Sequence, residues 1–259
     1  MNPIFNAIQT ELFKLRKSKM IRIIFAAFSI APLMGGLFMF ILKNPELAEN
    51  TGLIGAKAQI AGEANWPSYF GLLAQMIAIG GILIFGFVTS WIFGREYTDR
   101  TVKDLIALPF PRGTIILAKF ITAFIANILL SLYIIVLGIL LGLLIVLPNW
   151  SVSILSDGLV TLFITTLLTV ALSTPVALVA CYGRGYLAPL GFVVFMVVFS
   201  QIIAAIGYGA FFPWAIPALF SGISGTEGLI GIENLMIVIV TSIIGLVATF
   251  YWWRYADHS

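Results

Sequence analysis

The most unusual stretch of this chain is residues 93–113, FGREYTDRTVKDLIALPFPRG, which carries seven of the chain's 14 basic and 11 acidic side chains. Glu96 and Arg100, and likewise Arg100 and Asp104, lie four residues apart, so they can pair on one helix face. Such exposed pairs contribute only about 0.3–0.5 kcal/mol each, which makes stability a poor reason for the cluster. Charge of both signs on a short segment favours docking of a protein partner over binding of anionic lipid, which favours positive charge alone.

Residues suited to catalysis or metal binding are scarce in this sequence. The one histidine, His258, is the second-last residue, and the one cysteine, Cys181, cannot form an intrachain disulfide. The sequence has no metal-ligand spacing, no paired carboxylates within an apolar run and no phosphate-binding glycine motif. The sequence therefore predicts no catalytic residue, no metal site and no bound cofactor in this chain.

The elements that position the charged stretch are apolar. Of the 259 residues 61% are hydrophobic and 10% charged, with a mean hydropathy of +1.08, well above the apolar share of soluble domains. A helix needs about 20 largely apolar residues to cross the hydrocarbon core of a bilayer. Six runs qualify, and we expect an all-α integral membrane protein with spans at about 20–42, 69–94, 118–147, 158–183, 185–207 and 234–253.

Basic residues set the expected orientation, because loops rich in Lys and Arg stay in the cytoplasm. Five lie within residues 14–22 and five more within residues 95–119, whereas Lys43 and Lys57 are the two on the other side. Both termini and the loop at 95–117 are therefore predicted to be cytoplasmic. The positive net charge follows from these basic loops and gives no reason to expect nucleic-acid binding.

Residues 1–19 are too polar for a span and predict an amphipathic helix at the membrane surface. Its apolar stripe is Ile4, Ile8, Leu12 and Leu15, Phe5 is a further apolar residue of this interfacial helix, and Lys14 and Lys17 are available to anionic lipid. An ordinary basic leader that only sets topology is the alternative interpretation.

Uncharged polar residues interrupt the spans, whose interiors contain no ionisable group, so an ion-coupled transporter or channel is disfavoured. Thr161, Thr165 and Thr169 follow one helix face. One interpretation is that their hydroxyls bond to their own helix or to a neighbouring one. The sharper interpretation is a weakly polar transport path, for which the candidates are Asn127, Ser131, Thr161, Thr165, Thr169 and Gln201. Pro175 is expected to kink the fourth span.

A helix of about two turns is predicted within the charged stretch. Thr101 followed by Asp104 is an N-cap signature, and Pro109 disfavours helix at the residue before it. The helix would lie at the cytoplasmic surface between two long spans.

The chain resembles the permease subunits of type-2 ATP-binding-cassette (ABC) exporters. The resemblance rests on the six spans and on two segments, TELFKLRKSKM at 10–20 and FGREYTDRTVKDLIALPFPRGTIILAKF at 93–120. The resemblance is to the small permeases of peptide-antibiotic export and self-immunity in particular. It implies that the N-terminal piece is a connecting helix and that the loop after the second span holds the coupling helix that contacts the ATPase. The family's glutamate at the end of the second span falls on Glu96. The residues expected to couple to the ATPase are Glu96, Asp99, Arg100, Thr101, Lys103, Asp104 and Leu105.

The resemblance also implies the partners and the remaining topology. We expect two ATPase subunits, which bind the ATP and Mg²⁺, a second permease that is identical or paralogous, and the lipids of a prokaryotic plasma membrane. Residues 208–226 are expected to form a re-entrant segment on the outer side, because a seventh crossing would place the C-terminus outside. An interfacial loop or a short span is the alternative for this segment.

The expected function is ATP-driven export of an amphipathic substrate, such as a peptide antibiotic, by alternating access. Two other classes remain open: an ion-coupled secondary transporter or channel, and an immunity or receptor subunit that binds peptide without transporting it. The sequence does not identify the substrate.

Overall fold

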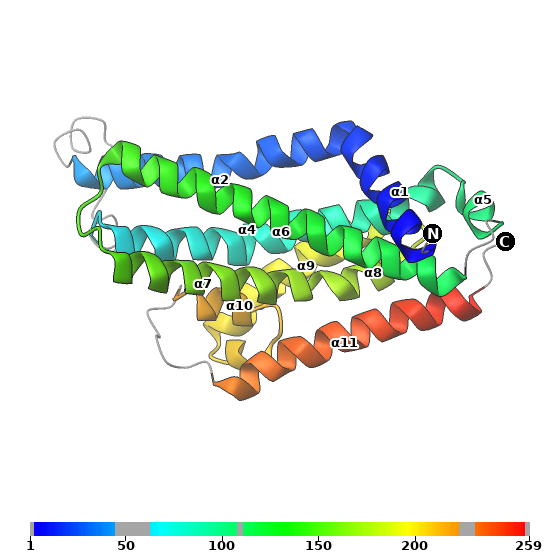
Figure 1. The fold of residues 1–259 in the computed structure, drawn as a ribbon. Coiled ribbons are helices and arrows are strands. Elements are labelled where there is room, and N and C mark those ends of the chain that lie inside the picture. Colours follow the sequence, from blue (N-terminus) through cyan, green and yellow to red (C-terminus); the bar gives the residue numbers. More distant parts are fainter. Residues whose placement is uncertain (1–2, 45–62, 108–110, 223–230, 257–259) are drawn as a thin grey trace.

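The computed structural model is an all-α membrane protein, as the sequence predicts (Figure 1). The structure describes residues 3–44, 63–107, 111–222 and 231–256. Within these ranges six helical stretches are long and apolar enough to cross a membrane. Their helices are α2 (Lys19–Lys43), α4 (Trp66–Thr98), α6 (Arg112–Ile145), α7 (Val152–Ala171) continued by α8 (Ser173–Tyr182), α9 (Leu187–Ala205) and α11 (Ile232–Tyr255).

Four shorter elements complete the described fold: α1 (Pro3–Lys17), α5 (Val102–Ile106), the 3-10 turn η2 (Gly209–Phe211) and α10 (Ile216–Phe220). Figure 1 shows α1, α5 and the last turn of α11 together at one end of the bundle, with both chain termini. Ser18 separates α1 from α2 and caps α2, because its hydroxyl accepts a hydrogen bond from the Met20 N–H at 3.0 Å.

Helix α4 lies at the centre of the bundle and packs against α2, α6, α7, α8 and α9. It is apolar on all sides, which is the pattern of a helix surrounded by other helices. Glycines allow these neighbours to approach closely. A Cβ on Gly138 of α6 would lie 2.6 Å from a Leu73 methyl of α4, and one on Gly158 of α7 would lie 2.5 Å from the Phe70 ring.

The fourth span is interrupted at Leu172, between α7 and α8, three residues before the proline that was expected to kink it. Beyond the break, Pro175 packs against α11, where a Cβ on Gly245 would lie 2.5 Å from the Pro175 nitrogen. The Thr174 hydroxyl donates to the Ser242 carbonyl at 2.8 Å and ties the same two helices together. The proline thus marks a tight α8–α11 contact as well as the break.

The connection between α9 and α11 folds back onto the bundle. Ile216 at the start of α10 is buried and shares a core cluster with Ile82 of α4 and Leu168 of α7. Asn234 of α11 holds this connection, since its amide donates to the Ala210 carbonyl at 2.8 Å. Residues 223–226 of the expected re-entrant segment lie outside the described residues, and its insertion into the membrane stays a prediction.

The long helices flanking the charged stretch extend further than the sequence suggested. α4 continues to Thr98 and α6 begins at Arg112, so the connection between them is shorter than the predicted 95–117. Consequently the first residues of the expected coupling segment, Arg95 and Glu96, belong to the last turn of a spanning helix.

Candidate functional site

The turn after α4 sets the position of the predicted coupling residues. Arg100 adopts the left-handed conformation (φ 59°), which reverses the chain, and the Thr101 N–H donates to the Glu96 carbonyl at 2.9 Å. α5 follows as five residues, with Val102 buried against the bundle and Lys103 and Asp104 exposed. The result is a short element held by the buried Val102 and by Leu105, which packs partly buried against the main core, with Lys103 and Asp104 facing outward.

A buried network of charges lies directly behind this turn. Lys119 of α6 is fully buried, and its ammonium donates to Glu96 Oε2 at 2.8 Å and to the Ile92 carbonyl at 2.9 Å. Its third partner is Glu11 Oε2 of α1, at 3.3 Å. A buried cation needs such partners, since an isolated charge is very costly away from water.

Two further cations complete the network. Lys14 of α1 pairs with Glu11 Oε1 at 2.8 Å and with Glu96 Oε1 at 3.4 Å, and Arg95 approaches Glu96 Oε1 at 3.5 Å. Arg95 also lies over the Trp91 ring, 4.7 Å from its centroid. α1, α4 and α6 are therefore joined at one point by ion pairs that residues far apart in the sequence supply.

The expectation that Glu96 sits on an exposed surface and pairs with Arg100 is wrong. Glu96 is 3% exposed, and its ion-pair partners among the described residues are Lys14, Arg95 and Lys119. The left-handed turn at Arg100 removes the continuous helix on which a pairing at four residues depends. The expected capping of α5 is also wrong, because the Thr101 side chain makes no capping hydrogen bond. Pro109, expected to end this helix, lies outside the described residues.

A shallow groove of about 470 Å³ opens between the turn and α1. It gathers residues from both segments that the sequence singled out, namely Lys14, Arg95, Glu96, Asp99, Thr101, Asp104 and Leu105. Of the predicted coupling set, Arg100 and Lys103 do not line this groove, although both are exposed beside it. A group bound in the groove would touch the outer edge of the buried charge network.

The N-terminal helix faces the bundle with part of its predicted apolar stripe. Leu15 is buried, Ile8 and Leu12 are half-buried, and Lys17 and Phe5 are exposed, Phe5 by 57%. α1 packs mainly on α6.

Sequence reasoning overlooked two members of the network, Glu11 and Lys119. Glu11 falls on the same helix face as Ile4, Ile8 and Leu15, so an acid within an apolar stripe was the available signal. Lys119 follows Arg112 by seven residues, inside a helix that is otherwise apolar at that point. A charge of opposite sign on an apolar face of each of these two helices was evidence for a contact between them.

The candidate path residues lie in two different environments. Asn127, Ser131, Thr165 and Thr169 are buried inside the bundle, whereas Gln201 is exposed and Thr161 half-exposed. Thr161, Thr169 and Ser131 donate to carbonyls four residues earlier in their own helices, as the alternative interpretation holds. The Asn127 amide is buried with no hydrogen-bond partner among the described residues. A transport path along these residues stays a prediction.

The described residues form six spanning stretches with α4 at their centre, and a charge network and a groove lie at the end of the bundle that holds α1 and α5. This arrangement defines a multi-pass membrane protein. A sequence model of the ABC-2 family transporter proteins matches residues 7–201. The chain belongs to this family.

A curated relative agrees with this assignment. The bacitracin transport permease protein BCRB of Bacillus licheniformis is 27% identical over 183 residues, which cover 70% of this chain and 88% of that protein. The matched family region includes α1 from residue 7, α5 and the network, and the predicted resemblance to an ABC-2 permease is confirmed.

Proposed function

We propose that this chain is the transmembrane subunit of an ATP-driven exporter and that it couples to separate ATPase subunits through the groove between α1 and the turn before α5. The observation that supports this most directly is the junction of the groove with the buried network. Glu96 both lines the groove and pairs with Lys119 inside α6. A force that a bound partner exerts at the groove would therefore be transmitted to α1, α4 and α6 together.

The charge distribution of the groove suits a protein partner. Asp99 and Asp104 are exposed at its rim, and Arg100 and Lys103 are exposed beside it. Complementary charges of both signs raise specificity and association rate at a protein interface. ATP and Mg²⁺ would bind to the partner, and this chain supplies the path and the mechanical contact.

The cargo we propose is an amphipathic molecule of the peptide-antibiotic class. The name of the relative from Bacillus licheniformis refers to bacitracin transport, and the described spanning helices place their charged residues near their ends. Two permeases with two ATPases would alternate between inward-facing and outward-facing states. The chain would lie in a prokaryotic plasma membrane with cytoplasmic termini.

Export by the intact complex tests this function. Cells carrying the chain and its cognate ATPase should accumulate less bacitracin and survive more of it than cells lacking either subunit. Replacement of the ATPase's catalytic glutamate should abolish this protection, whereas collapse of the proton gradient at constant ATP should not. Protection that survives ATPase inactivation would instead identify an immunity subunit, and protection lost with the gradient a secondary transporter.

A further inference from the structure

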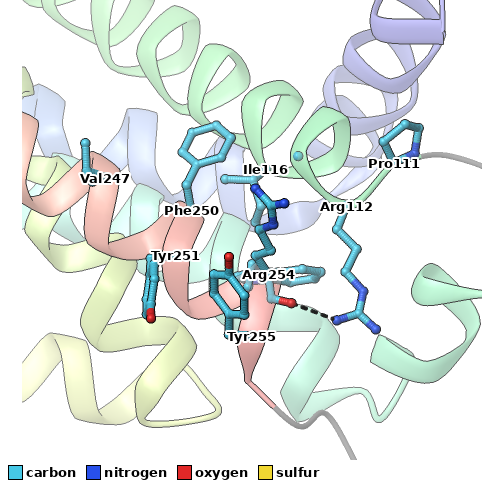
Figure 2. A pocket seen from close by; sticks show the side chains of 10 residues that line it. Pro111, Arg112, Ile116, Val247, Phe250, Tyr251, Arg254 and Tyr255 are labelled. Atoms are coloured by element: carbon cyan, nitrogen blue, oxygen red, sulfur yellow. Dashed lines mark hydrogen bonds between the residues drawn. The ribbon is translucent and has the colours of Figure 1, made fainter.

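A second pocket lies at the same end of the bundle, between the start of α6 and the end of α11 (Figure 2). Its volume is about 520 Å³, and it is lined by Pro111, Arg112, Gly113, Ile116, Val247, Phe250, Tyr251, Trp253, Arg254 and Tyr255. The lining contains two arginines and no acid. It shares no residue with the groove at α5.

The two arginines come from different helices, and the Arg112 side chain reaches the backbone of Arg254. Arg112 Nη1 donates to the Arg254 carbonyl at 3.4 Å, which Figure 2 shows as a bridge from the start of α6 to the end of α11. The Arg254 guanidinium lies 5.5 Å from the Tyr255 ring centroid. Both arginines are exposed, and neither has an acidic partner among the described residues. Such a pair favours an anion, and guanidinium groups match phosphate oxygens well.

An apolar cleft continues from this pocket along the outer surface of α11. The cleft has a volume of about 600 Å³ and is lined by Leu178, Ile243, Ile244, Val247, Ala248, Tyr251 and Trp252. It shares Val247 and Tyr251 with the arginine pocket. From Arg254 to Ile243 the helix descends eleven residues, or about 16 Å, into the expected membrane.

We propose that the arginine pocket and the apolar cleft together form a binding site for an anionic phospholipid. The phosphate would lie between Arg112 and Arg254, and one acyl chain would follow the cleft toward Ile243. Tyr251 and Tyr255, whose ring centroids are 4.6 Å apart, would lie at the headgroup level that aromatic side chains favour. A soluble anion would occupy the arginine pocket alone, whereas a phospholipid would occupy the pocket with its headgroup and the cleft with an acyl chain.

A second copy of the chain is a less suitable occupant of this surface. In a twofold dimer centred on this surface, the same patch would face itself and bring Arg112 and Arg254 toward their own counterparts. Like charges opposed in this way are unfavourable. The lipid proposal does not depend on export, because it concerns this chain alone.

Native mass spectrometry of the purified full chain would measure the binding of phosphatidylglycerol and of phosphatidylcholine with identical acyl chains. We expect preference for phosphatidylglycerol. Arg112→Gln or Arg254→Gln should each weaken that binding about fivefold, and the double variant about twentyfold, with phosphatidylcholine unchanged. Arg254→Lys, which keeps the charge, should retain most of it. Arg22→Gln removes an exposed arginine of α2 outside the pocket and serves as the matched control.

The apolar half of the site has its own variant. Ala248→Trp would fill the cleft and should weaken both lipids equally, whereas Ile239→Trp, on α11 outside the cleft, should weaken neither. Thermal unfolding of each variant shows that it is folded. Equal losses in Arg22→Gln and the double variant would overturn the proposal. So would displacement of the lipid by millimolar inorganic phosphate, which would indicate a free-anion site, or loss of a dimer rather than of lipid in the double variant.

Discussion

Lys119 Nζ and Glu96 Oε2 lie 2.8 Å apart, and this contact joins the cytoplasmic ends that we assign to α6 and α4. Both side chains are buried, and Glu11 and Lys14 connect the same pair to α1. Since an ion pair out of water keeps a defined geometry only when its other partners are also in place, the network holds three helices in one relative position. We regard it as the rigid base of the coupling element.

Removal of the buried cation should destabilise the protein. Lys119→Met leaves Glu96 and Glu11 with only the outer cations Lys14 and Arg95, and we expect a loss of about 3 kcal/mol in the free energy of unfolding. Thermal and denaturant unfolding of the detergent-purified chain measure it. Lys17→Met, an exposed lysine of α1, is the control and should change little. The double variant Lys119→Met with Glu96→Gln should recover part of the loss, and no recovery would show that the two side chains do not interact.

The close approach of Gly94 to the turn between α8 and α9 should be equally important for the position of the network. A Cβ at Gly94 would lie 2.6 Å from the Gly185 carbonyl carbon, which is backbone and cannot rotate away. Gly94→Ala should therefore shift the end of α4, cost about 1–3 kcal/mol and reduce coupling. Gly71→Ala in the same helix meets no atom within 4 Å and should be neutral or slightly stabilising. Equal effects of the two substitutions in unfolding measurements would contradict this packing argument.

The spans were predictable because their signal is local. Each apolar run is long enough to cross a bilayer by itself, and the sequence located all six described spans, with ends that differ from the observed ones by up to six residues. Helix ends were less predictable. α4 and α6 extend into the charged stretch because their last and first turns, at Glu96 and Arg112, are supported by contacts with α1 and α11 that no local pattern contains.

The sequence identified the segment that contributes most of the candidate site, but it did not give the positions of the side chains in that segment. Residues 96–105 were identified from charge and resemblance, yet Glu96 was expected to be exposed and to pair with Arg100, and it is buried. Its burial depends on Glu11 and Lys119, which are 85 residues before it and 23 residues after it. The charges of Glu11 and Lys119 on otherwise apolar helix faces were visible in the sequence. Their contacts with each other and with Glu96 depend on how the helices pack.

Cysteine labelling should establish the orientation and the path of the chain between α9 and α11. The native Cys181 is buried, so the background should be low. An impermeant thiol reagent should reach Ser153→Cys, Tyr208→Cys and Ile232→Cys in intact cells, and Thr98→Cys only after permeabilisation. These four positions are exposed. Labelling of Tyr208→Cys and Ile232→Cys from opposite sides would require a seventh crossing, and a fully reversed pattern would overturn the orientation.

Charge reversal on the exposed face of α5 should separate coupling from folding. Asp104 is exposed, lines the groove and has no ion-pair partner among the described residues, so Asp104→Lys should leave unfolding nearly unchanged. A reversed charge facing its complement on the ATPase is repelled, and we expect partner affinity or substrate-stimulated ATP hydrolysis to fall about tenfold or more. Glu96→Lys is not an equivalent test, because a fourth cation in the buried network would destabilise the chain. Glu63→Lys, an exposed acid before α4 at the opposite end of the bundle, is the matched control and should leave both quantities at the parent value. If Asp104→Lys binds and stimulates a cognate ATPase as the parent does, the groove is not the coupling surface, and the charges at 99–104 only hold this loop in the aqueous phase.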